Sequence, residues 1–164
     1  MVDAGGAWVF RHEPSEDPAR MQCFHQREMV RLGAPEDVRA WRESWCERGL
    51  ALLRSLGLDA ERERASDPFF GRGGRMLAAN QRAAELKWEL VVPIAGDEPT
   101  AVTSFNYHEE HFAEIYGLAL EDGGAAHTAC LGFGQERIVL ALLRAHGLDP
   151  AVWPREVRDE LWGT

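Results

Sequence analysis

The chain has 164 residues, 45% of them hydrophobic and 27% charged, which suits one globular domain with a sizeable core. Its 18 basic and 27 acidic residues give a formal net charge of −9, which excludes a broad basic surface for nucleic acid. No apolar run approaches the roughly 20 residues of a membrane helix, and no signal peptide is evident. Three widely spaced cysteines are typical of reduced thiols, so we expect a cytoplasmic protein.

The first third of the chain predicts two strands and a long helix. Residues 7–11 are expected to form a strand, residues 12–19 a turn, and residues 20–32 a second strand that pairs with the first. Pro35 suits the first turn of a helix, and apolar residues at helical spacing continue it for about six turns, to Leu56.

The rest of the chain mixes strands and helices within a single domain, residues 1–164. In chain order we predict a glycine-rich loop at 66–75, a helix at 76–87, strands at 88–94 and 100–107, a helical turn at 108–116, a strand at 127–133, and helices at 135–146 and 150–162. Because these elements do not alternate as strand–helix–strand units, we predict an α+β fold: a mostly antiparallel sheet flanked by helices.

A first group of charged and aromatic residues follows the predicted strand pair. Arg11 and Glu13 are two residues apart, and Arg20, Phe24 and Glu28 are four apart, so each set shares one face of a strand. Guanidinium groups bind phosphate oxygens, and an aromatic ring can stack on a purine. An exposed strand pair with ordinary salt bridges explains the same pattern equally well.

A second group lies where the last predicted strand meets its helix. Gly132 and Gly134 allow close approach of a ligand to the backbone, and Arg137 lies in the first helical turn, where anions are favoured. A simple turn is the alternative interpretation. The pattern is not a dinucleotide-binding fingerprint, because arginine replaces the third glycine and no βαβ unit surrounds it.

Together the two groups resemble the second and third motifs of class II aminoacyl-tRNA synthetases. The second motif matches Phe10-Arg11-His12-Glu13 and then Arg20 to Phe24, and the third matches Gly132 to Arg137 before an apolar helix. Further matches to the seryl branch are Lys87-Trp88-Glu89-Leu90, Ser104-Phe105-Asn106 and His127-Thr128. The resemblance extends from Trp8 to about Leu148. It implies ATP-dependent formation of an aminoacyl-adenylate.

The resemblance also implies a role for individual residues. Arg11, Arg20 and Arg137 would act on the phosphates of ATP and so serve catalysis. Glu13 would meet adenine and Phe24 would stack on it. The remaining residues expected at the ATP site are Met21, Lys87, Thr103, Ser104 and Phe105. Mg²⁺ is expected to assist, with Glu89 or Glu98 as the candidate acidic ligand.

Within the family the chain looks like the amino acid:carrier protein ligases, which are truncated seryl-type homologues. The loop between the second-motif strands is short, from Pro14 to Ala19, and residues 67–75 look like a carrier-docking segment. The implied partners are a small amino acid and a carrier protein with a phosphopantetheine thiol, while tRNA is not expected. Whether the chain forms a homodimer stays open.

These ligases hold zinc with two cysteines and a glutamate, and Glu28 and Cys130 match two of the three ligands. The third ligand is absent from this chain: Cys23 points to the face opposite Phe24, and Cys46 is expected in the core. The family's first motif is also missing, so we expect an N-terminally truncated synthetase-like domain. A non-catalytic nucleotide- or partner-binding domain and a fragment of a seryl-type tRNA synthetase remain the alternatives.

Overall fold

A six-stranded antiparallel sheet is the centre of the structure. The computed structural model describes residues 2–65, 85–96 and 98–163. The strands lie in the order β1-β2-β6-β5-β4-β3, and every adjacent pair is antiparallel. They are β1 Val2–Phe10, β2 Cys23–Gly33, β3 Glu61–Arg64, β4 Lys87–Val92, β5 Thr100–Glu109 and β6 His127–Gly134. The predicted α+β fold with an antiparallel sheet is thus confirmed.

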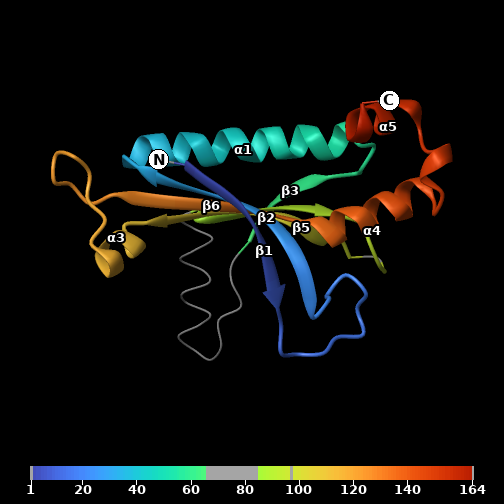
Figure 1. Cartoon of the computed structure of the whole chain (residues 1–164), viewed down its shortest axis with the longest axis horizontal. Coiled ribbons are helices and arrows are strands. Elements are labelled where there is room, and N and C mark those ends of the chain that lie inside the picture. Colours follow the sequence, from blue (N-terminus) through green and yellow to red (C-terminus); the bar gives the residue numbers. More distant parts are fainter. Residues whose placement is uncertain (1, 66–84, 97, 164) are drawn as a thin grey trace.

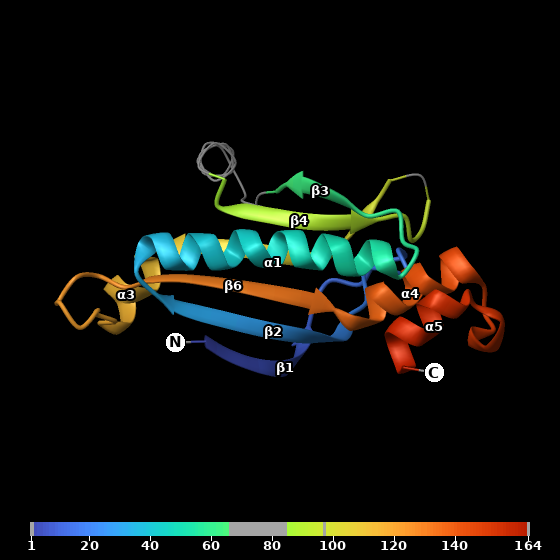
Figure 2. The same ribbon diagram turned by 90° about the horizontal axis from the view of Figure 1, so that it is seen from above.

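One long helix covers one face of this sheet. Helix α1 Pro35–Ser55 runs along the sheet, whereas the loop between β1 and β2 extends on the other side (Figures 1 and 2). The remaining helical elements are α3 His111–Tyr116, α4 Gln135–His146, η1 Pro150–Val152 and α5 Arg155–Trp162. None of the helices in the described part of the chain combines the length and apolar composition that a membrane span needs.

The core lies between α1 and the sheet. Cys46 and Leu53 of α1 are buried against a group of sheet residues that includes Leu90, Phe105 and Leu131. The helix approaches the sheet closely at Gly49, where an added Cβ would lie only 3.1 Å from the ring of Phe105. Burial raises the pKa of the Cys46 thiol to about 11, in keeping with the predicted structural role of this residue.

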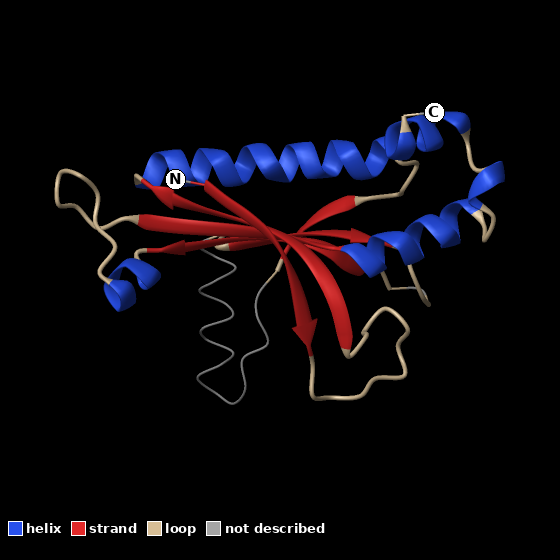
Figure 3. Ribbon diagram, viewed as in Figure 1, coloured by secondary structure: helices blue, strands red, loops and turns tan. Residues whose placement is uncertain are grey.

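The C-terminal helices are joined to the end of α1 by a small aromatic cluster. The Nε2 atom of His146 lies 2.8 Å from the carbonyl oxygen of Leu56, and the indole nitrogen of Trp153 donates to the carbonyl of Gly147. Trp153 also packs against His146 and Trp162. This cluster holds α4 and α5 at one end of the molecule (Figure 3).

The structure departs from the predicted elements in several places. The charged segment Glu61–Arg64 lacks apolar alternation, so the sequence pattern does not predict β3. The second strand begins at Cys23 and not at residue 20, because Asp17 caps a turn through the backbone of Ala19 and Arg20. A helix cannot extend to Lys87, where β4 begins. The rest of the predicted helix, residues 76–84, and the glycine-rich loop at 66–75 lie outside the described residues.

The packing of α1 predicts a sharp contrast between two neighbouring leucines. Leu53→Ala should lower the free energy of unfolding by about 2–5 kcal/mol, because it opens a cavity at a fully buried position. Leu52→Ala is the matched control, because Leu52 is 41% exposed and should change stability much less. Urea denaturation measures both values. Equal losses for the two variants would contradict this description of the core.

Candidate active site

A cavity of about 210 Å³ opens on the face of the sheet opposite α1. Its walls come from the loop after β1, from β2, β4, β5 and β6, and from the first turn of α4. The lining residues are Arg11, Phe24, Gln26, Lys87, Glu89, Ala101, Val102, Thr103, Ser104, Gly132, Gly134 and Arg137. Three cationic side chains, one aromatic ring and one carboxylate therefore meet at one place on the described surface.

Arg11 and Phe24 form one wall of this cavity. The backbone amide of Arg11 donates to the carbonyl of Gln22, so the strand pairing continues one step beyond β1. The guanidinium carbon of Arg11 lies 5.0 Å from the centre of the Phe24 ring, within reach of a cation–π contact. Phe24 as a whole is 8% exposed.

Arg137 connects three segments around the cavity. Its Nε donates to the carbonyl of Ala19 and one terminal nitrogen donates to the carbonyl of Ala101, both at 2.7 Å. Burial lowers the pKa of the Arg137 guanidinium, and the positive charge of Arg11 acts in the same direction. The site therefore concentrates positive charge where an anion would relieve the repulsion.

Two glycines keep the floor of the cavity open. A Cβ at Gly132 would lie 3.2 Å from the side-chain amide of Gln26, and one at Gly134 would lie 3.4 Å from the carbonyl oxygen of Val102. A side chain at Gly132 would therefore crowd Gln26, whereas one at Gly134 would touch β5 and Arg137 at ordinary contact distance.

Lys87 and Glu89 form the opposite wall, with the Lys87 ammonium 3.3 Å from a carboxylate oxygen of Glu89. Ser104 pairs with Glu89 and with Gly132, so its side chain shares their face. Thr103 borders the cavity, but its partners Leu90 and Phe133 indicate that its side chain lies on the helix-covered face.

Phe105 requires a correction. The sequence predicts it in the ATP site, but its ring is fully buried on the helix-covered face against Phe133. The reason is strand alternation: Ser104 faces the cavity, so its neighbour Phe105 must face the core. Its contribution is to the packing that holds β5 in place.

Three other predicted residues do not line the cavity. Glu13 and Arg20 are exposed in the loop between β1 and β2, and Met21 borders a separate hollow beside Val139 of α4. Because β2 begins only at Cys23, Arg20 does not share a strand face with Phe24 and Glu28 as expected. Sequence spacing could not show that Arg20 lies outside β2, because it does not reveal the turn that Asp17 forms just before Arg20.

A second cavity, of about 350 Å³, lies further along the same open face. Glu28 and Cys130 both line it, together with His108, Thr128 and an apolar group formed by Val30, Leu32, Phe112, Tyr116 and Leu118. The Cys130 sulfur lies 3.5 Å from Nε2 of His108, and Nδ1 of His108 lies 3.0 Å from the Thr128 hydroxyl. The structure thus brings the predicted residues Glu28 and Cys130 to one site.

Known proteins are similar to this chain in sequence and in fold. The chain is 47% identical to amino acid–[acyl-carrier-protein] ligase 1 of Bradyrhizobium diazoefficiens over 93% of its own length and 47% of that ligase. It is 34% identical to the type-2 serine–tRNA ligase of Methanococcus aeolicus, over 98% of this chain and 32% of that ligase. No protein-family model matches the sequence.

A solved structure decides the fold. The seryl-tRNA synthetase of M. kandleri, in complex with A. aeolicus tRNASec, superposes with a TM-score of 0.77 and 26% identity. The alignment covers 99% of this chain and 33% of the synthetase. This chain is a class II synthetase-like domain. It spans less than half the length of the curated relatives that it matches.

The synthetase-like domain offers one candidate site for Mg²⁺ and only part of a zinc site. Glu89 is the carboxylate in the first cavity, and Mg²⁺ can bind to one carboxylate together with substrate phosphates. Glu98 is exposed and lies outside that cavity. The described residues contain no group of three His, Cys, Asp or Glu side chains placed to hold a metal. Glu28 and Cys130 lie in one cavity as two candidate donors, but the described residues do not support a complete zinc site.

Two residues of the domain were not singled out from sequence. Gln26 lines the first cavity. It lies two residues after Phe24 on β2, so the alternation of side chains along a strand could have identified it. His108 joins Cys130 to Thr128, but these residues are far apart in sequence and only the pairing of β5 with β6 shows their proximity.

Replacing Arg137 should lower the stability of the chain and loosen the loop between β1 and β2. Arg137→Gln removes the two arginine bonds to the carbonyls of Ala19 and Ala101, so unfolding free energy should fall by about 1–3 kcal/mol. Trypsin should also cut faster after Arg11 and Arg20 in the adjoining loop. Denaturation and limited proteolysis measure these effects.

Arg144→Gln is the control for this prediction. Arg144 lies on the same helix but is exposed, and it makes one long hydrogen bond, of 3.5 Å, to the carbonyl of Gly96. It should leave stability and the cleavage rate nearly unchanged. Wild-type behaviour of Arg137→Gln in both assays would show that Arg137 does not anchor the loop.

Proposed function

We propose that this domain binds ATP and a small amino acid and forms the aminoacyl-adenylate, which then loads the thiol of a carrier protein. The observation that carries the proposal is the meeting of Arg11, Lys87 and Arg137 in one cavity beside the ring of Phe24. The similarity to an amino acid–[acyl-carrier-protein] ligase supports the carrier protein as the acceptor.

In the first step, an oxygen of the amino acid carboxylate attacks the α-phosphorus of ATP. The bond from the α-phosphorus to the bridging oxygen breaks, and pyrophosphate leaves. Both reactants are anionic, so Arg11, Lys87 and Arg137 would offset their repulsion and the charge that builds up on the phosphate oxygens. Arg20 would reach the outer phosphates from the neighbouring loop, where its charge already acts on Arg137. Mg²⁺, held by Glu89, would supply further positive charge to the phosphates.

The nucleoside would lie against Phe24, with Glu13 and Met21 approaching from the loop between β1 and β2. Since the guanidinium of Arg11 now covers the Phe24 ring, Arg11 would leave the ring when it binds the α-phosphate. From β5, Ser104 would contact the nucleotide through its side chain, and Thr103 through its backbone.

The amino acid would bind in the second cavity. The Glu28 carboxylate would bind the substrate ammonium group by charge-assisted hydrogen bonds. The β2–β6 register pairs Glu28 with Gly132, a residue of the first cavity, so the two sites adjoin. In the second step, the phosphopantetheine thiol would attack the aminoacyl carbonyl carbon, its proton would be lost to solvent, and AMP would leave. The segment predicted to dock the carrier, residues 67–75, lies outside the described residues.

A serine–tRNA ligase fragment is the second candidate function. The similarity to type-2 serine–tRNA ligases favours it. The six-residue loop from Pro14 to Ala19 and the net charge of −9 favour the carrier protein instead. Transfer of the activated amino acid to tRNA would establish the second function, and transfer to the phosphopantetheine thiol would establish the first.

The test of the proposed function is exchange of labelled pyrophosphate into ATP in the presence of single amino acids. We expect one small amino acid to support exchange, and Arg11→Gln to lower the rate by about a hundredfold or more. Arg27→Gln is the control, because Arg27 is exposed on β2 between residues of the cavity face. If no amino acid supports exchange at saturating ATP, the non-catalytic alternative replaces this proposal.

Glu28 and Cys130 are the residues proposed to contact zinc. No step of the proposed reaction depends on zinc. Because these two donors fall short of the three protein ligands of an open zinc site, the chain should bind zinc weakly. Cys130→Ser should weaken binding further, whereas Cys23→Ser should not, since Cys23 is exposed elsewhere on β2. Competition against a chromogenic chelator measures the affinity. Tight, equimolar zinc in the purified chain would reveal a third donor.

A further inference from the structure

The backbone just before β4 adopts an unusual conformation. Glu85 has a φ of 54°, in the left-handed region that residues other than glycine rarely occupy. It lies two residues before Lys87, a cationic residue of the first cavity. A strained conformation persists only where its surroundings enforce it, and such conformations gather at functional sites.

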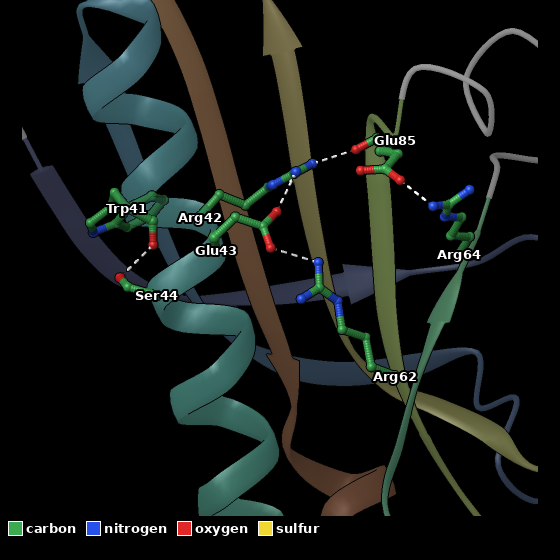
Figure 4. A network of polar contacts seen from close by, with 7 residues as sticks. All are labelled: Trp41, Arg42, Glu43, Ser44, Arg62, Arg64 and Glu85. Carbon is green, nitrogen blue, oxygen red and sulfur yellow. Dashed lines mark hydrogen bonds and ion pairs between the residues drawn. The ribbon is translucent and has the colours of Figure 1, made fainter.

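A buried arginine on α1 holds this residue in place. Arg42, whose side chain is 7% exposed, donates to the carbonyl oxygen of Glu85 at 2.6 Å and to the carboxylate of Glu43 at 2.5 Å. The second carboxylate oxygen of Glu43 accepts from Arg62 of β3 at 2.6 Å. Arg64 of β3 also pairs with the Glu85 carboxylate. Figure 4 shows these residues joining α1, β3 and the start of β4.

This polar network is charged in the folded state. Burial by itself would raise the pKa of Glu43, but the hydrogen bond from Arg62 and the charge of Arg42 outweigh that effect and hold the pKa below its ordinary value. The carboxylate therefore stays ionised at neutral pH and keeps both arginines oriented. A guanidinium suits this position because its planar fork can donate in two directions at once.

The network acts on the face of β4 opposite the cavity. The guanidinium carbon of Arg62 lies 3.9 Å from the centre of the Trp88 ring, and Trp88 alternates with Lys87 and Glu89 along β4. Two backbone hydrogen bonds fix the chain at Leu86 and Lys87. The amide of Tyr107 donates to the carbonyl of Leu86, and the amide of Ala65 donates to the carbonyl of Lys87. These bonds hold the backbone on both sides of the Lys87 Cα, and Lys87 lies on the strand face that lines the cavity.

We propose that Arg42 is a positioning residue for nucleotide binding: it fixes the backbone of Glu85 and thereby directs Lys87 into the first cavity from the other side of the sheet. Arg42 itself does not line that cavity. This inference rests on the proposed function, because it assumes that Lys87 binds the phosphates of ATP.

The experiment measures the dissociation constant of ATP, by isothermal titration calorimetry, for the whole chain and its variants. Arg42→Gln should weaken ATP binding about tenfold, the scale expected when a binding group is displaced slightly. Arg54→Gln is the matched control, because Arg54 also donates from α1 to a backbone carbonyl, that of Ala60, but far along the helix from Lys87. It should bind ATP as the wild type does.

A double variant separates positioning from a general loss of stability. If Arg42 acts through Lys87, Arg42→Gln should add almost nothing to the loss caused by Lys87→Gln, whereas independent effects would add. Arg42→Lys keeps the positive charge beside the Glu43 carboxylate, so it should fold even if Arg42→Gln does not, and its ATP affinity should lie between those of wild type and Lys87→Gln.

The outcomes distinguish the inference from the proposed function. No ATP binding by the wild type would overturn the proposed function and the positioning role with it. ATP binding by the wild type with unchanged affinity in Arg42→Gln, or in Arg42→Lys if the first variant is unfolded, would overturn the positioning role alone. A fully additive loss in the double variant would do the same.

Discussion

The pairing of β2 with β6 is the constraint on which the candidate site depends. It places Glu28 opposite Gly132 and Gln26 opposite Gly134, so two segments about a hundred residues apart form one surface. A shift of one residue in this register would turn Phe24 and Glu28 toward α1 and bring Arg27 to the cavity face. The register is favoured by the burial of the apolar side chains on the face that α1 covers (Figure 1).

The two faces of the sheet have different physical tasks. The covered face carries the large apolar side chains, such as Leu90, Phe105 and Leu131, and supplies the packing that keeps six strands in register. The open face carries the charged residues, where guanidinium, ammonium and carboxylate groups can meet ligands. Arg42 connects the two faces. It extends from α1 on the covered side and bonds to the carbonyl of Glu85, just before the strand that carries Lys87 on the open face.

Much of this arrangement could be predicted from the sequence. Helical spacing after Pro35 and the strand-to-helix change at Gly134 determine α1 and α4, and α4 was predicted to the residue. The resemblance to synthetase motifs identified Arg11, Phe24, Lys87, Ser104 and Arg137, which the fold brings into one cavity. The two helices could be predicted because local patterns of spacing and turn residues specify them. The roles of the cavity residues at an ATP site stay a prediction.

Other features depend on tertiary contacts that spacing does not reveal. Phe105 lies in the core because the alternation along β5 is fixed by its partners Trp88 and Leu131. Strand β3 is recognised only through its pairing with β4, and the contact of His108 with Cys130 only through the pairing of β5 with β6. The Arg42 network joins Arg42, Arg62 and Glu85 from separate segments of the chain, and none of these residues belongs to a predicted motif.

The most direct test of the account is a crystal structure with a non-hydrolysable aminoacyl-adenylate analogue, in which a sulfamoyl group replaces the phosphate. The account predicts the adenine beside Phe24, the sulfamoyl group among Arg11, Lys87 and Arg137, and the amino group at Glu28. An analogue bound away from the open face of the sheet, or with its aminoacyl group outside the cavity of Glu28 and Cys130, would contradict it.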